Sequence, residues 1–81
     1  MKLEKRLEAI MMDTLVAMEQ TGHRVAAVNE RLLDADLKPS EVRSLAGALR
    51  SLEVAKARQS KTLQEVGVRL EKMRAAKAAK E

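Results

Sequence analysis

Apolar residues recur with alternating spacings of three and four along the second half of this 81-residue chain. Such a heptad spacing keeps one stripe of side chains on one side of a helix and is typical of a coiled-coil seam, the line along which two helices pack. The second half is therefore predicted to be one long helix that packs lengthwise against another. The series runs through Val42, Leu45, Leu49, Leu52, Lys56, Gln59, Leu63, Val66, Leu70 and Met73, of which only Lys56 and Gln59 are polar.

A second apolar stripe, with a period nearer 3.6, precedes the single proline of the chain, Pro39. Proline disfavours helical geometry at the preceding Lys38, and Ser40 suits the N-cap of a helix. We expect helix one at about residues 2–34, a turn at 35–39, helix two at about 40–77, and a basic frayed tail at 73–81. The stripe runs through Leu3, Leu7, Ile10, Thr14, Ala17, Met18, Thr21, Gly22, Val25, Val28, Leu32 and Ala35.

A turn this short makes the two helices antiparallel. The prediction is a single all-α domain over residues 1–81, an antiparallel two-helix hairpin packed as in a coiled coil. The register set by the turn places Leu63 near Met12, Leu49 near Ala26 and Lys56 near Glu19. Lys56 and Gln59 are expected to form a polar layer that fixes this register.

Gly22 lies in the middle of helix one, where glycine weakens a helix by about 1 kcal/mol relative to alanine. We favour a continuous helix in which Gly22 lets the neighbouring helix approach closely, because the apolar stripe stays in phase on both sides. The alternative is a kink or break. A ligand site formed by His23, Lys56 and Gln59 is a further alternative to the polar layer.

The N-terminal half carries more apolar residues than one facing helix can cover, namely Ile10, Met11, Met12, Leu15, Val16 and Met18. A two-helix unit of this size also buries little surface on its own. We therefore expect the hairpin to self-associate into a four-helix bundle or larger helical oligomer, and to contact another protein. The predicted protein interface comprises Met11, Leu15, Met18, Val25, Leu49, Leu52, Leu63, Val66 and Leu70. The predicted function is that of a non-enzymatic assembly, adaptor or chaperone module.

Charge is distributed unevenly along the chain. Residues 1–41 contain six Lys/Arg and eight Asp/Glu, a net −2, whereas residues 42–81 contain ten and four, a net +6. The simplest interpretation of this asymmetry is that oppositely charged side chains of the two helices pair with each other. In the alternative, the protein is a nucleic-acid accessory protein that binds phosphate nonspecifically through the basic second helix, whose cations are expected to scatter over the solvent-facing arc. The candidate polyanion contacts are Arg69, Lys72, Arg74, Lys77 and Lys80, of which the last three lie in the segment from Met73 onward that is expected to lack an intramolecular partner.

The composition predicts no reaction chemistry. The chain has no cysteine and one histidine, His23, so a zinc site is not expected. Its three glycines are isolated within helical patterns rather than gathered in a phosphate-binding loop. Phe, Tyr and Trp are absent, which disfavours recognition of single-stranded nucleic acid by stacking. We expect no catalytic residue, cofactor, metal, small-molecule substrate or membrane contact, and a cytoplasmic location.

Pro39, Ser40 and residues 58–62 resemble the second helix of type III secretion needle subunits, which are helical hairpins of about this length. The hairpin plan is similar to that of small secretion chaperones, and helix two looks similar to the oligomerisation segments of phage small terminase subunits. The chain lacks the aromatic residues of needle subunits and the helix-turn-helix of many small terminases. No family is assigned from these resemblances.

Overall fold

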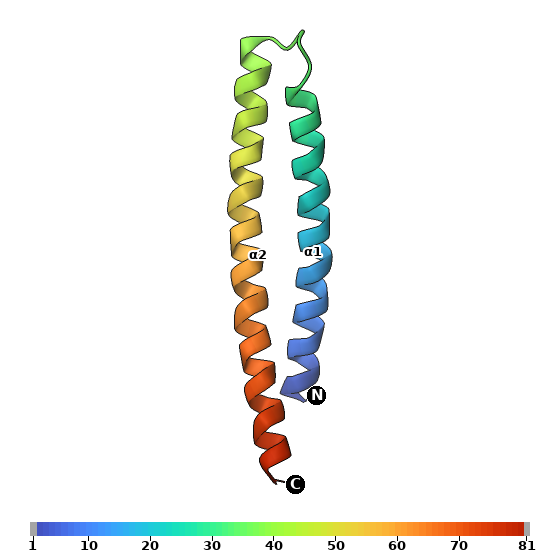
Figure 1. Ribbon diagram of the computed structural model, residues 1–81, viewed down its shortest axis with the longest axis vertical. Helices are drawn as coiled ribbons and strands as arrows, with labels where there is room; N and C mark the ends of the chain where they lie inside the picture. Colours follow the sequence, from blue (N-terminus) through green and yellow to red (C-terminus); the bar gives the residue numbers. More distant parts are fainter. Residues whose placement is uncertain (1, 81) are drawn as a thin grey trace.

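The computed structural model of the protein describes residues 2–80, which form two helices, α1 (Leu3–Leu32) and α2 (Pro39–Lys80). The helices lie side by side in opposite directions and give a rod of 65 × 18 × 14 Å. Figure 1 shows that α2 extends past the N-terminal end of α1. The prediction of an all-helical chain whose two helices pack against each other is confirmed.

The helix boundaries differ from the expected ones at the start and end of α2. The Val42 N–H donates to the Lys38 carbonyl at 3.0 Å, so Lys38 is the N-cap residue and Pro39 the first helical position. The expectation that Ser40 caps the helix was wrong, because a proline at the first position needs no N–H and its fixed φ already suits a helix. The helix also continues to Lys80, beyond the expected end near residue 77.

The turn is held by local hydrogen bonds rather than by glycine. The Asp34 N–H donates to the Arg31 carbonyl at 3.1 Å, which tightens the end of α1. The Asp34 Oδ1 accepts a hydrogen bond from the Asp36 N–H at 3.0 Å. Asp side chains in turns often bond in this way to the backbone N–H two residues later. No described residue has a positive φ, so side chains are tolerated throughout the turn.

The side chains of α1 that face α2 follow the same heptad spacing as those of α2. The spacing nearer 3.6 expected for this helix was wrong, because Leu3 and Ile10 remain 57% and 42% exposed while Glu4 and Met11 are partly buried instead. Both helices therefore contribute alternating three- and four-residue steps to a single seam. On α1 the seam runs through Glu4, Leu7, Met11, Thr14, Met18, Thr21, Val25, Val28 and Leu32.

The buried apolar core lies at the end of the hairpin opposite the turn. Leu7, Val66 and Leu70 are 4%, 7% and 1% exposed, and Met11 and Met73 pack against them. Fully burying a side chain of this size contributes about 1.5–3 kcal/mol. Most apolar side chains in the rest of the seam are only partly buried, so this end supplies much of the stability of the isolated hairpin.

Two predicted seam positions of α2 are exposed to solvent. Val42 is 42% exposed, and Lys56 is exposed while the neighbouring Ala55 is partly buried. A lysine at the edge of a helix interface keeps its ammonium group in water. The polar layer expected from Lys56 and Gln59 is thus reduced to Gln59 alone.

The helix is continuous through Gly22, as favoured, but Gly22 does not have the role expected of it. A Cβ atom built on Gly22 would meet no heavy atom within 4 Å beyond its own helix backbone. The expectation that Gly22 lets α2 approach closely was therefore wrong. A Cβ atom built on Gly47, which also lies within a helix, would likewise meet no heavy atom within 4 Å.

Substitution of Gly22 by alanine is expected to stabilise the protein by about 0.5–1 kcal/mol, because the added methyl group has space and alanine loses less backbone entropy in a helix. Denaturant unfolding at fixed protein concentration, followed by circular dichroism, measures this change. The reverse substitution at an exposed position of the same helix, Ala26→Gly, is expected to destabilise by a similar amount. A destabilised Gly22→Ala protein would contradict the open environment of Gly22.

Candidate functional site

The nine residues predicted to form a protein interface divide into three groups by exposure. Val66 and Leu70 are buried in the core of the hairpin itself, and Leu15 is 43% exposed. The other six are partly buried along the seam of the single chain, namely Met11, Met18, Val25, Leu49, Leu52 and Leu63. Only Leu15 therefore retains a large exposed surface for another molecule.

Exposed apolar side chains cluster beside Leu15 on α1. Met12 and Val16 are 61% and 51% exposed. The three residues are spaced three and four apart in the helix, so their side chains are surface neighbours. We call Met12, Leu15 and Val16 the α1 patch. Sequence reasoning placed all three in a surplus apolar face but included only Leu15 in the interface, because the seam had to be located before off-seam residues could be identified.

Further exposed apolar side chains are more dispersed. On α1, Leu3 and Ile10 are 57% and 42% exposed, two turns apart. On α2, Val54 and Val68 are 51% and 43% exposed, fourteen residues apart, and so do not touch each other. Single exposed apolar residues are normal on protein surfaces. The α1 patch differs from them because its members are contiguous.

The basic C-terminal segment pairs with the acidic start of α1. The Arg74 guanidinium lies 3.3 Å from the Glu8 carboxylate and 3.6 Å from that of Glu4, and the Lys77 ammonium lies 4.0 Å from Glu4. Met73 packs against the core. The expectation that this segment lacks an intramolecular partner was therefore wrong for its first half, because α1 begins early enough to reach it.

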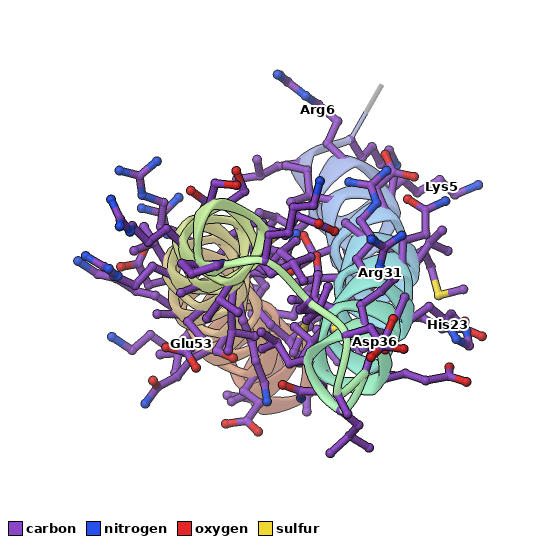
Figure 2. The ribbon with its side chains drawn as sticks, turned by 90° about the horizontal axis from the view of Figure 1, so that it is seen from above. Lys5, Arg6, His23, Arg31, Asp36 and Glu53 are labelled. Carbon is purple, nitrogen blue, oxygen red and sulfur yellow. The ribbon has the colours of Figure 1, made fainter. Side chains whose placement is uncertain are left out.

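The remaining cations of α2 leave one side of that helix strongly basic. Arg43, Arg50, Arg58 and Lys61 are all exposed, and within residues 2–80 none lies within 4.0 Å of a carboxylate. At 100° per residue they fall in an arc of about 80°, on the side of α2 away from the seam. We call these four residues the α2 ridge. Figure 2 shows nitrogen-tipped side chains gathered on the side of α2 away from α1.

The expected scatter of basic residues thus does not hold for the first half of α2. From Arg43 to Lys61 the outward face carries no carboxylate, since Glu53 lies nearer the flank of the helix. Farther along, Glu65 and Glu71 are interspersed with Arg69 and Lys72. The predicted polyanion contacts Arg69, Lys72 and Lys80 are exposed, and no carboxylate of residues 2–80 lies within 4.0 Å of them.

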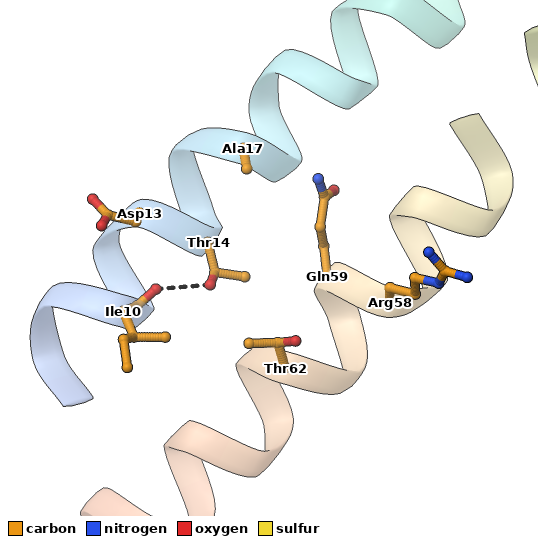
Figure 3. Close-up of a pocket in the computed structure, with 7 residues that line it drawn as sticks. All are labelled: Ile10, Asp13, Thr14, Ala17, Arg58, Gln59 and Thr62. Carbon is orange, nitrogen blue, oxygen red and sulfur yellow. Dashed lines mark hydrogen bonds between the residues drawn. The ribbon is translucent and has the colours of Figure 1, made fainter. Parts of the chain in front are cut away.

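A shallow groove of about 290 Å³ lies between the helices near their middle. Figure 3 shows Gln59 and Thr62 of α2 in the space between the two helices, whereas Asp13 and Arg58 extend away from it. The Thr14 hydroxyl donates to the Ile10 carbonyl at 2.7 Å and so offers no free donor to a neighbour. The lining is Ile10, Asp13, Thr14, Ala17, Arg58, Gln59 and Thr62.

The structure does not bring together the residues considered for a ligand site. His23 points away from α2 (Figure 2), with its side chain 77% exposed, while Gln59 lies between the helices. His23 instead lies 3.7 Å from Glu19 on its own helix. Among residues 2–80 no group of three or more His, Cys, Asp or Glu side chains is placed to hold a metal ion.

Neither described helix contains an apolar stretch long enough to cross a membrane. Comparison of the chain with family models, curated proteins and solved structures found no match. The candidate functional surfaces of the hairpin are the α1 patch and the α2 ridge.

Gln59 provides a test of the seam at this groove. Its Oε1 atom is buried and accepts no hydrogen bond from the described residues. Leaving such an atom unpaired costs about 1–3 kcal/mol, and methionine has a similar length and helix propensity. Gln59→Met is therefore expected to raise the free energy of unfolding by about 1 kcal/mol, measured by denaturant titration. The exposed Gln64→Met is the control, with a smaller expected change; a less stable Gln59→Met would show that the amide is needed.

Proposed function

We propose that this protein is a non-enzymatic assembly module that self-associates, and contacts other proteins, through the α1 patch. The observation that carries the proposal is the contiguous exposure of Met12, Leu15 and Val16 on a hairpin in which, among residues 2–80, the buried apolar core consists of Leu7, Val66 and Leu70. Covering the patch would remove apolar surface from water, which is the main driving force of most protein association. A scaffold, adaptor or chaperone role follows from such a contact.

The geometry of the patch supports an intermolecular role. Its three side chains occupy positions flanking or opposite the seam, so α2 cannot cover them without giving up its own contacts with Leu7 and Met11. Small two-helix units also gain stability when a partner buries more of their surface. Folding and association are therefore expected to be coupled.

The first test is sedimentation equilibrium over a wide concentration range. The wild-type mass is expected to rise above the 9.0 kDa of the single chain as concentration increases. Met12→Gln/Val16→Gln is expected to weaken self-association about 1,000-fold, because a dimer loses apolar burial of about 1 kcal/mol at each of its four replaced side chains. Helix content should largely remain, since the seam is untouched and glutamine is a good helix former.

The matched control is Val54→Gln/Val68→Gln, which replaces two similarly exposed apolar side chains on α2. This control is expected to associate as the wild type does. A wild-type protein that stays monomeric at every concentration would contradict self-association. An equal loss in both double variants would show that the effect does not come from the α1 patch.

We also propose a second candidate function, the binding of nucleic-acid phosphate, which the α2 ridge favours. Its three arginines can each form paired hydrogen bonds with a phosphate. Because the chain has no aromatic residues, it would contact the phosphate backbone of the nucleic acid rather than stack on its bases. The ridge and the α1 patch lie on different helices, so the two functions are compatible. The C-terminal cations would contribute less, because Arg74 and Lys77 already pair with Glu4.

If the ridge binds duplex DNA with four phosphate contacts, the logarithm of the association constant should fall against the logarithm of salt concentration with a slope of about −4. Arg50→Gln/Arg58→Gln should reduce that slope by about two. Arg24→Gln/Lys38→Gln changes the net charge equally away from the ridge and should leave the slope nearly unchanged. Fluorescence anisotropy with a labelled duplex measures the salt dependence for the wild type and both double variants. Absence of wild-type binding at low salt would exclude this function.

A further inference from the structure

Two opposite charges lie at equal distances on either side of Met12, a member of the α1 patch. Lys5 precedes Met12 by seven residues and Glu19 follows it by seven. Seven residues complete almost two turns of a helix, so the three side chains lie along one line on the surface of α1, with about 10 Å between successive positions. α1 is continuous over this whole span.

This line of side chains is open to solvent and faces away from α2. Met12 is 61% exposed and the Glu19 side chain 74% exposed. Figure 2 shows Lys5 and His23 extending from the side of α1 that is remote from α2. Within residues 2–80 no carboxylate lies within 4.0 Å of the Lys5 ammonium, and Glu19 is near only His23, at 3.7 Å. Both charges are thus accessible to a partner.

We propose that a second copy of the chain packs its α1 antiparallel against this α1, about a two-fold axis at Met12, so that Lys5 of each copy faces Glu19 of the other. The inference rests on the proposed self-association and specifies its geometry. A two-fold contact is self-complementary, because each surface meets an identical one. The equal spacing of Lys5 and Glu19 from Met12 is what an antiparallel pair of identical helices requires.

The charges select this orientation over the parallel one. In a parallel pair Lys5 would face Lys5 and Glu19 would face Glu19, which is repulsive. In the antiparallel pair Met12 faces Met12 and Val16 lies beside Ala9 of the partner, so the centre of the contact is apolar. A polyanion or an anionic membrane would match only one of the two charges, whereas a second copy matches both.

The neighbouring charges are compatible with the antiparallel arrangement. Glu8 would lie beside Leu15 of the partner, at the edge of the contact. Its carboxylate already lies 3.3 Å from the Arg74 guanidinium of its own chain, so its charge is compensated there. The basic side of α2 lies on the opposite side of the hairpin from this contact, and the two copies would therefore meet through their acidic helices.

Charge exchange tests the proposal, with sedimentation equilibrium as the measurement. Lys5→Glu and Glu19→Lys, each alone, create like-charge contacts at both ends of the interface and should weaken association about tenfold. The double variant Lys5→Glu/Glu19→Lys should restore wild-type association, because each pair is re-formed with its signs exchanged. An equimolar mixture of the two single variants should also associate more tightly than either alone. Lys61→Glu, on α2, is the control and should have little effect.

A second measurement locates the two-fold axis. The chain has no cysteine, so Met12→Cys introduces a single thiol, and Cys residues facing each other across the axis should form an intermolecular disulfide on mild oxidation. Val54→Cys, on α2, should remain largely unlinked. Single-charge variants that associate as the wild type does, or a double variant that is not restored, would overturn the antiparallel geometry while leaving self-association intact. A wild-type protein that never associates would overturn both.

Discussion

The packing of Leu7 against Val66 and Leu70 is the interaction on which the rest of the hairpin depends. These residues are far apart in the sequence, and their contact holds together the end of the rod opposite the turn. The turn at residues 33–38 restrains the other end. Between these two restraints Thr21 is buried at 5% exposure, but the apolar side chains of the seam are only partly buried. The register is therefore set from the ends rather than by a continuous apolar core.

Electrostatics supports the same register. Arg74 pairs with Glu8 near the core, and Arg31 pairs with Glu41 across the turn at 3.8 Å. Each such exposed pair contributes less than about 1 kcal/mol, so neither stabilises the fold strongly. A slip of one heptad, however, would place Arg74 opposite Leu15 instead of Glu8. The pairs therefore penalise alternative registers in which the apolar heptads would still overlap.

Much of the fold could be predicted because α2 carries a long heptad series and the only proline lies between the helices. The seam of α1 could not be located with the same accuracy. Residues 9–18 are apolar on nearly every side, with only Asp13 and Thr14 polar, so composition alone does not show which side meets α2. Leu3 and Ile10 fitted a helical stripe and are nevertheless exposed.

The same limitation explains the outcome for the candidate interface. Eight of its nine residues are at least partly buried within one hairpin, because a heptad stripe has the same appearance whether its partner helix is in the same chain or in another. The C-terminal pairing was missed for a related reason. Contacts of Arg74 and Lys77 with Glu4 depend on where both helices begin and end, and a difference of a few residues determines whether those side chains meet.

The uneven charge of the two helices limits how copies of the hairpin can assemble. α1 contains four Lys/Arg and five Asp/Glu, a net −1, whereas α2 contains ten and four, a net +6. Contact through two copies of α2 would bring like charges together, which opposes association. Contact through α1 leaves the α2 ridges apart on the outside of the assembly. In that arrangement the α1 contact and the α2 ridge use different side chains, so the proposed dimer would present two separate basic ridges to a polyanion. The dimer would bind with higher avidity where both ridges can contact the same polyanion at once.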